Sequence, residues 1–469
     1  MASTSALLCA ILTCFLAHSA ASSSFVSRRG AQLLLDNRPF YFIGANAYWL
    51  MDVAKMSHTR NQVDRFFKYC NSYGLTVVRM WAFNEGCPSA PGVYDPVEMA
   101  AFDYIINSAG SHKIKLILAL GNTWTAYRSP EDFFLMAGVN PANKTLLDWY
   151  GSRPLRDLYK SHITAMVTRK NSLNGLEYRE DPTIMMWDVI NEPRCPGCTQ
   201  HWQQQVHLSF LKEMSDYLRA MASKQLTAVG TEGYYMDAAH LPYNPGAGAF
   251  CEGEDWIAMS AIGSVDVTTA HIYDRQVEAV PPTWRQPTFE DIMNFFSLSL
   301  SSHTDASRAQ GKPFVVEEFN LLSTAFSTEQ RAQLFQLVYD ALVDSAKSGG
   351  ALAGAMFWNA AIGSDVGDDG YNVYLDVGGG VMPSRRLFGS GAGPGQPVRQ
   401  AVVANTEGLD AFRGGPQRLE CAEAEARSGW LPLWAQSGGR SVSLATYEQR
   451  TSHKQVQDII RQTAGRLPK

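Results

Sequence analysis

The hydrophobic pattern of the chain alternates between short, continuous apolar runs and longer segments with apolar residues at helical spacing. The clearest run spans residues 181–193, where a nearly continuous apolar stretch is bounded by Pro182 and Pro193. Such a run is typical of a strand that is buried on both faces, as in a parallel sheet. The rest of the predicted fold is arranged around this strand.

Similar runs predict seven further strands, at residues 38–46, 76–81, 114–122, 226–232, 265–271, 313–319 and 354–359. The segments with helical spacing lie between them, at residues 59–73, 99–111, 155–168, 202–222, 289–309 and 329–347. Strands that alternate with helices indicate parallel β-α-β units. Eight such strands match a closed barrel better than an open sheet. The predicted fold class is therefore α/β, a (β/α)8 TIM barrel.

The alternation stops at residues 377–451, which open with three glycines and carry a second glycine-rich stretch at 389–395. This composition is turn-rich and low in complexity. The amphipathic segment 456–467 follows it, and we predict this segment to be the eighth barrel helix. The predicted organisation is a barrel over residues 22–376, a turn-rich insertion of unknown role over 377–451, and the last barrel helix within 452–469.

Length and composition fit one large globular unit. The chain has 469 residues, 45% of them hydrophobic and 18% charged, and a barrel with insertions fills this length as one domain. A net charge of -5 gives no electrostatic footprint for nucleic acid. The 11 Trp and 19 Tyr residues offer flat faces that suit stacking on sugars, although core packing explains them equally well.

The N-terminus predicts secretion. An apolar run of about a dozen residues ends in small residues that suit signal-peptidase cleavage, so we expect residues 1–21 to be a signal peptide. No later segment is long and apolar enough to cross a membrane. Six cysteines remain after cleavage, an even number compatible with disulfides in an extracellular or cell-wall location. Asn143 begins an Asn-Lys-Thr sequence and is a glycosylation candidate.

Two glutamates end predicted strands: Glu192 the central one, and Glu318 the seventh. In a (β/α)8 barrel the C-terminal strand ends form the floor of the active site. Two carboxylates there can cleave a glycosidic bond, one protonating the leaving oxygen while the other attacks the sugar carbon or activates water. Glu317 competes with Glu318, because adjacent strand residues point to opposite sides. We expect Glu318 to face the pore and Glu317 the helix layer.

Other strand ends carry polar or aromatic residues that suit the same chemistry. Arg79 can keep a nucleophilic carboxylate ionised, and the charge of Glu318 is then expected to raise the pKa of Glu192. Tyr273 can hydrogen-bond the nucleophile, and Trp358 can stack under the sugar. Packing explains each of these residues taken alone. It does not readily explain such residues at the ends of five predicted strands.

The motifs at residues 78–81, 187–195, 271–273, 317–319 and 357–358 resemble glycoside hydrolase family 5, and within it the plant and fungal endo-β-1,4-mannanases. The resemblance runs from about residue 25 to residue 376. It implies a retaining double displacement with Glu192 as acid/base and Glu318 as nucleophile. It also implies a β-mannan substrate. We expect a monomer, and the reaction requires no metal or organic cofactor. The remaining positions that match subsite -1 are Arg79, Asn191, His271, Tyr273 and Trp358, and Trp81 and Asn122 match positions near the cleft.

The chain departs from this pattern in its cleft-wall loops and at Asp188, where the family usually has Glu. Asn122-Thr123-Trp124 also replaces an Asn-Asn-Tyr-like turn. A β-1,4-glucanase or a transglycosylase of the same fold is therefore the alternative function. A non-catalytic glycan-binding barrel is the alternative outside enzymes, and the joint presence of Glu192 and Glu318 argues against it.

Cys195 and Cys198 lie just beyond Glu192 and allow a redox pair, half of a zinc site or a loop disulfide. The sequence holds no second cysteine pair at zinc spacing and no thioredoxin-like context. Fungal members of the family that the chain resembles carry a similar pair at this place. The resemblance therefore favours a disulfide beside the acid/base.

Overall fold

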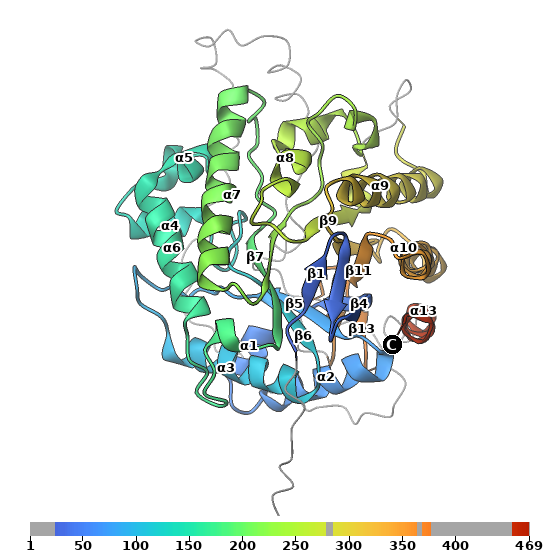
Figure 1. The fold of residues 1–469 in the computed structure, drawn as a ribbon, viewed down its shortest axis with the longest axis horizontal. Helices are drawn as coiled ribbons and strands as arrows, with labels where there is room; N and C mark the ends of the chain where they lie inside the picture. The colour runs from blue at the N-terminus through green and yellow to red at the C-terminus, as the bar shows by residue number, and fades with distance from the viewer. Residues whose placement is uncertain (1–23, 278–284, 364–367, 377–452, 469) are drawn as a thin grey trace, which may run out of the picture.

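The computed structural model describes residues 24–277, 285–363, 368–376 and 453–468. In this part of the chain, eight strands form one sheet in the order β8-β7-β6-β5-β4-β11-β10-β9, and every neighbouring pair is parallel. A parallel bridge between Ala228 and Val267 joins the two outer strands. The sheet is therefore closed into the predicted (β/α)8 barrel (Figure 1).

All residues of the eight barrel strands are buried, which explains why the strands appear in the sequence as continuous apolar runs. Their bounds are β4 Phe42–Asn46, β5 Val77–Trp81, β6 Lys115–Ala119, β7 Ile184–Asn191, β8 Leu226–Gly230, β9 Thr268–Tyr273, β10 Phe314–Asn320 and β11 Leu352–Phe357.

Helices surround the barrel (Figure 1). The long ones are α2 Asn61–Tyr73, α3 Pro96–Ser111, α6 Arg153–Val167, α7 His201–Met221, α9 Phe289–Ala309, α10 Thr328–Ser348 and α13 Lys454–Arg466. Shorter helices are α1 Leu50–Lys55, α4 Pro130–Met136, α5 Leu146–Gly151 and α8 Trp256–Ser260. Several begin with capping boxes, such as those of Thr288 at α9 and Ser327 at α10, which satisfy free backbone N–H groups at the helix start.

Helix α13 occupies the place of the last barrel helix, between α10 and α2 (Figure 1). Arg466 Nη1 lies 2.7 Å from Asp340 Oδ1 of α10, and the Arg461 guanidinium lies 4.1 Å from the ring centre of Tyr73 of α2. The predicted signal peptide 1–21 and the predicted insertion 377–451 lie outside the described residues.

A small antiparallel sheet precedes the barrel and was not predicted. It consists of β1 Ser27–Arg29, β2 Gln32–Leu35 and β3 Arg38–Pro39. Leu33 and Val26 pack against side chains of three barrel strands, namely Phe42 of β4, Val77 of β5 and Ile117 of β6. The small sheet therefore covers the N-terminal end of the barrel and leaves the C-terminal end for the site. A further parallel pair, β12 Ala360–Ala361 and β13 Val373–Tyr374, follows β11. None of the described helices has the length and apolar character needed to span a membrane.

Candidate active site

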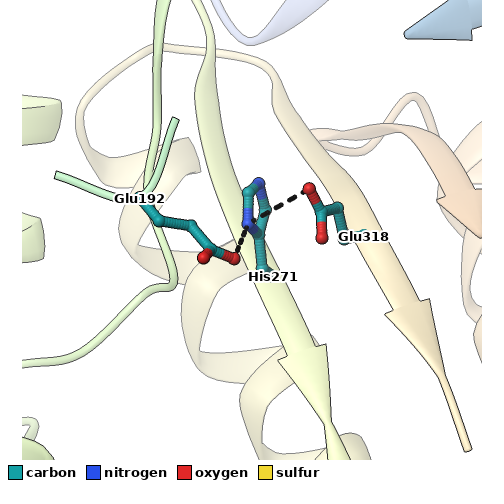
Figure 2. A group of neighbouring side chains, drawn as sticks. All are labelled: Glu192, His271 and Glu318. Atoms are coloured by element: carbon teal, nitrogen blue, oxygen red, sulfur yellow. Dashed lines mark hydrogen bonds and ion pairs between the residues drawn. The ribbon is translucent and has the colours of Figure 1, made fainter. Parts of the chain in front are cut away.

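Glu192 and Glu318 face each other across the C-terminal end of the barrel, with His271 between them (Figure 2). Glu192 directly follows β7, His271 belongs to β9, and Glu318 belongs to β10. His271 Nδ1 lies 2.7 Å from Glu192 Oε1 and 3.6 Å from Glu318 Oε1. All three side chains are buried, so one imidazole connects two carboxylates in the interior of the barrel end.

The three side chains each offer one ligand atom within 4.8 Å of the others, a spacing that a metal ion also uses. However, the charge of Glu318 and the hydrogen bond to Glu192 outweigh the effect of burial and raise the pKa of His271 to about 10. A protonated imidazole has no lone pair to offer a metal. The arrangement therefore fits an imidazolium between two carboxylates better than a metal centre.

The backbone at Glu192 is strained. Its φ of 44° lies in the left-handed region, which costs a non-glycine residue on the order of 1 kcal/mol. The Glu192 N–H donates to the carbonyl oxygen of Gly230 at 2.6 Å, and the Thr123 hydroxyl donates to the carbonyl oxygen of Glu192. These contacts hold the strained turn, which directs the carboxylate into the site.

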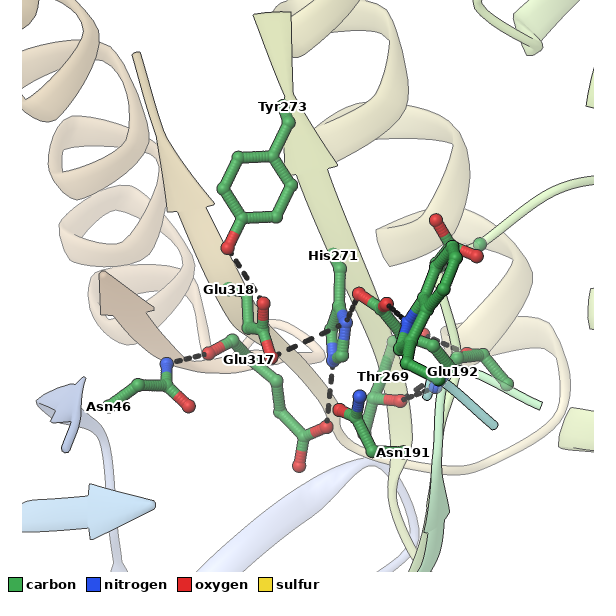
Figure 3. Close-up of polar contacts among 12 residues, drawn as sticks. Asn46, Asn191, Glu192, Thr269, His271, Tyr273, Glu317 and Glu318 are labelled. Atoms are coloured by element: carbon green, nitrogen blue, oxygen red, sulfur yellow. Dashed lines mark hydrogen bonds and ion pairs between the residues drawn. The ribbon is translucent and has the colours of Figure 1, made fainter. Parts of the chain in front are cut away.

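Glu318 is held through both of its oxygens. The Tyr273 hydroxyl donates to Oε2 at 2.7 Å (Figure 3). On the other oxygen, Arg79 Nη1 lies 2.6 Å from Oε1. Arg79 is fully buried and also donates from Nη2 to Asn191 Oδ1 at 2.6 Å and from Nη1 to Asn46 Oδ1 at 3.2 Å. The guanidinium is thus fixed in a position that orients the Glu318 carboxylate.

The electrostatics of the pair differ from the sequence-based expectation. Burial raises the pKa of Glu318 and outweighs the opposing charges of His271 and Arg79. Burial also acts on Glu192, but the hydrogen bond and charge of His271 reverse its effect and lower the pKa of Glu192. The prediction that Glu192 has the raised pKa and Glu318 the lowered one is wrong for the free site. The reason is His271, which lies closer to Glu192 than to Glu318.

The prediction that Glu317 faces the helix layer is also wrong. Glu317 is fully buried, and its Oε2 lies 3.4 Å from His271 Nε2 (Figure 3). The same oxygen lies 3.6 Å from Arg79 Nε. The register between β10 and β9 shifts between Val316 and Glu318. Such an irregularity breaks the alternation of side chains along the strand. Glu317 and Glu318 therefore both point into the barrel, with Glu318 bonded to the predicted site residue Tyr273.

The remaining predicted site residues lie beside this centre. Asn191 Nδ2 donates to Asn122 Oδ1 at 3.3 Å. Trp81, Trp358 and Tyr273 form one buried aromatic cluster, in which the rings of Trp81 and Trp358 are 5.7 Å apart. The Arg79 guanidinium lies 5.1 Å from the ring centre of Trp81. The barrel thus brings all nine predicted catalytic and substrate-binding residues together at one end.

The structure also places the predicted disulfide and the predicted glycosylation site. Cys195 and Cys198 form a disulfide in the loop after Glu192. Asn143 is exposed at the end of the short 3-10 helix η1 Pro141–Asn143.

Sequence reasoning missed the role of Trp124, which it noted only as a departure in a loop. Trp124 Nε1 donates to Glu192 Oε2 at 2.5 Å. The Arg194 guanidinium lies 4.5 Å from the ring centre of Trp124 and forms an ion pair with Glu232. Only the position of Trp124 just after a strand end pointed to the site. Asp369 was also missed; it accepts from Trp358 Nε1 at 2.7 Å.

Comparison with known proteins agrees with this geometry. The family model "GH family 5 beta-mannosidase-like" matches residues 139–368. Mannan endo-1,4-beta-mannosidase 2 of Oryza sativa subsp. japonica is 36% identical over 377 residues, which cover 76% of this chain and 81% of that protein. Mannan endo-1,4-beta-mannosidase 1 of Arabidopsis thaliana is 32% identical, with coverage of 76% and 87%. The crystal structure of the endo-1,4-beta-mannanase from Rhizomucor miehei has a TM-score of 0.61 at 28% identity, covering 75% of this chain and 95% of that one.

Proposed function

Because the chain belongs to the β-mannosidase-like group of glycoside hydrolase family 5, we propose that it hydrolyses internal β-1,4-mannosidic bonds of mannan, glucomannan or galactomannan. It is a glycoside hydrolase by its family and fold. The observation that carries the proposal is the pair Glu192 and Glu318 at the barrel mouth, joined by His271, in a chain whose relatives bear the name mannan endo-1,4-beta-mannosidase.

The proposed reaction is a retaining double displacement. An oxygen of Glu192 and an oxygen of Glu318 lie within 4.8 Å of each other. Retaining glycosidases keep their carboxyl groups at about 5 Å, whereas inverting enzymes need more room for a water molecule. Glu318 attacks the anomeric carbon and forms a glycosyl ester while Glu192 gives a proton to the leaving oxygen. Glu192 then takes a proton from water, which attacks the same carbon and releases Glu318.

The proton for the first step is held by the pair of Glu192 and His271. In the free site His271 carries it, since the pKa of His271 is raised to about 10 and that of Glu192 is lowered. The 2.7 Å hydrogen bond between them is the path by which the proton reaches Glu192. A bound sugar displaces water from the site and disfavours the separated charges, which moves the proton onto Glu192.

Aromatic rings support the choice of a sugar substrate. Tyr48 is stacked on Trp358 at 5.1 Å with an interplanar angle of 4°, and Trp81 adjoins them. Rings of this kind offer apolar faces to the C–H surfaces of a sugar and polar edges to its hydroxyls. The choice of mannan over other β-1,4-glycans rests on the relatives.

We further propose that the enzyme is secreted and acts as a monomer on wall polysaccharide. The predicted signal peptide 1–21 motivates this proposal, although it lies outside the described residues. The disulfide of Cys195 with Cys198 and the exposed acceptor Asn143 are compatible with an oxidising, glycosylating route. Secretion of the full chain from a eukaryotic host, with a glycan on Asn143 by mass spectrometry, tests this part.

The catalytic proposal is tested with Glu192→Gln and Glu318→Gln, assayed on mannan, galactomannan, glucomannan and β-1,4-glucan with sizing of the products. Both variants should keep the circular dichroism spectrum of the wild type and lose nearly all hydrolysis. Glutamine has the shape of glutamate, but it cannot deliver a proton at position 192 or attack as an anion at position 318. Glu180→Gln, which changes an exposed carboxylate ahead of β7, is the matched control. Full activity of either active-site variant would overturn the assignment.

Two outcomes separate the finer claims. Long products of mixed size indicate internal cleavage, whereas release of single sugars would contradict it. Azide should restore turnover in Glu318→Gly and give a product of inverted configuration, because the small anion replaces the missing nucleophile on the opposite face. Preferred cleavage of β-1,4-glucan would favour the glucanase alternative instead.

A further inference from the structure

Two acidic side chains lie fully buried beneath the nucleophile and take no part in the proposed bond cleavage. Asp188 of β7 accepts from Arg79 Nε through Oδ2 at 2.7 Å. Glu317 of β10 places its Oε2 3.6 Å from the same Nε and 3.4 Å from His271 Nε2. Both carboxyl groups are 0% exposed. They therefore share one cation in the interior of the barrel.

Each of these carboxyl groups has one oxygen left over. Asp188 Oδ1 and Glu317 Oε1 receive no hydrogen bond from any N–H or O–H donor of the described residues. The two carboxyl groups lie at the same donor atom, since Asp188 Oδ2 is 2.7 Å and Glu317 Oε2 is 3.6 Å from Arg79 Nε. An ionised carboxylate only accepts hydrogen bonds. A hydrogen bond between the two groups therefore requires a proton on one of them.

The balance of charge around the pair also requires a proton. Among the described residues, the cations in contact with the pair are Arg79 and His271. Both also contact Glu318, and His271 contacts Glu192 as well. Four carboxyl groups thus face two cations in a buried site. Tyr159 of α6, whose hydroxyl donates to the carbonyl oxygen of the neighbouring Val189 at 2.6 Å, adds no positive charge. An unpaired buried charge is costly, so one carboxyl group is expected to stay neutral.

We propose that Asp188 and Glu317 share one proton, with the neutral Asp188 Oδ1–H donating to ionised Glu317 Oε1, and that this pair positions Arg79 for the nucleophile Glu318. Glu317 is the ionised partner because it lies beside both cations, whereas Asp188 contacts Arg79 alone. With Asp188 neutral, Glu317 is the one ionised carboxylate of the pair that attracts Arg79. The Nη1 atom of Arg79 then remains hydrogen-bonded to Glu318. Asp188 and Glu317 are positioning residues in this arrangement.

Two observations support the assignment. Burial, followed by the charge of Glu317, raises the pKa of Asp188 to about 8, whereas Arg79 and His271 outweigh burial at Glu317 and lower its pKa. Gly230 gives the pair its room, because a Cβ there would lie 2.9 Å from Arg79 Nη2 and 3.4 Å from Glu317 Oε2. A side chain at position 230 would displace the guanidinium from the carboxyl pair.

The test compares two isosteric variants that respond in opposite ways. Asp188→Asn keeps the shape, the acceptor for Arg79 and a donor for Glu317, so kcat should fall less than in Glu317→Gln and the acidic limb of the kcat/KM profile should keep its place. Glu317→Gln removes the anion that balances Arg79 and His271. We expect kcat to fall about tenfold or more, with the acidic limb of the profile displaced to lower pH, because both cations then act more strongly on Glu318.

The opposite ranking of the two variants would place the proton on Glu317 and overturn the assignment. Equal displacement of the acidic limb in both variants would show that both groups are ionised. Infrared spectroscopy provides a reading that does not need activity: the band of a protonated buried carboxyl group should be present in the wild type at neutral pH, retained in Glu192→Gln and absent in Asp188→Asn. A band unaffected by Asp188→Asn would refute the shared proton.

The activity comparison rests on the proposed hydrolytic function, whereas the infrared comparison does not. A chain that cleaves none of the tested glycans would therefore contradict the proposed function and leave the proton assignment to be decided by the spectra. If Glu317→Gln fails to fold, the infrared spectra of Asp188→Asn and the wild type decide the proposal.

Discussion

Trp124 contacts the proposed acid/base Glu192 on the carboxylate oxygen that His271 does not bind. Its Nε1–H donates to Glu192 Oε2 at 2.5 Å, and Arg194 covers its ring. Arg194 is itself held by Glu232 and by Glu252, whose Oε2 lies 2.9 Å from Nη1. The indole therefore has little freedom to turn away, and its N–H stabilises the ionised form of Glu192.

We predict that Trp124→Phe raises the pKa of Glu192, because the variant keeps an aromatic ring beside Arg194 and loses only the N–H donor. A raised pKa favours transfer of the shared proton from His271 onto Glu192, so the pair of Glu192 and His271 keeps that proton to higher pH. The alkaline limb of kcat/KM should then move to higher pH by up to about one unit, since a hydrogen bond to a charged group contributes about 1.5 kcal/mol. Trp202→Phe, at an exposed tryptophan of α7, is the control for the substitution. An alkaline limb that stays in place would reduce Trp124 to a packing residue.

The motifs of the sequence were enough to name the residues that converge at the barrel mouth, because the ends of parallel barrel strands must meet there. They were not enough to orient Glu317. The two-residue period of a strand assumes regular pairing, and the irregularity at Val316 is a property of the pairing between β10 and β9. The ionisation of the pair was likewise not predictable, because it depends on which carboxylate lies closer to His271.

At the scale of helices and strands, strong periodicity gave accurate predictions. The helix expected at residues 289–309 is α9 Phe289–Ala309, and the one expected at 202–222 is α7 His201–Met221. Both have a continuous apolar stripe that must be buried against the barrel. The small sheet β1 to β3 was missed because its strands have two to four residues and their pairing, not their pattern, defines them.

The contact of α2 with α13 leads to a prediction for Gly74. This residue ends α2 in the left-handed region at φ 75°, and a Cβ there would lie 2.3 Å from Ala464 Cβ of α13. Gly74→Ala should lower the free energy of unfolding by about 1 kcal/mol from backbone strain, with an added cost from displacement of α13.

Gly138→Ala separates the two contributions. Gly138 has a φ of 72°, and beyond its two chain neighbours no heavy atom of the described residues lies within 4 Å of the position that an alanine methyl group would take there. Chemical denaturation of both variants measures the difference between them. Gly74→Ala should be the less stable variant. Equal destabilisation of the two would mean that α13 yields to the added methyl group without loss.

At the scale of the whole molecule, residues on either side of positions 377–452 lie in contact. The ring centres of Tyr374 and His453 are 5.7 Å apart, and Gln457 Nε2 of α13 donates to the carbonyl oxygen of Tyr374 at 2.6 Å. The barrel thus holds together the two points at which this long segment leaves and rejoins it. A short bridge is long enough to connect them, since an extended residue spans about 3.3 Å.

We therefore predict that replacing residues 377–451 with a short Gly/Ser bridge leaves a soluble barrel whose Tm is close to that of the full chain. Val456 and Ile460 of α13 are buried against the barrel. The fold therefore requires helix α13 after β13. Truncation after residue 376, which removes α13 as well, is the matched control and should lower the Tm strongly, because it exposes the apolar surface of α10 and α2. Thermal unfolding of the three proteins decides the point. If the bridged chain were as unstable as the truncated one, the segment would be part of the folded core and the division of the chain into barrel and insertion would be wrong.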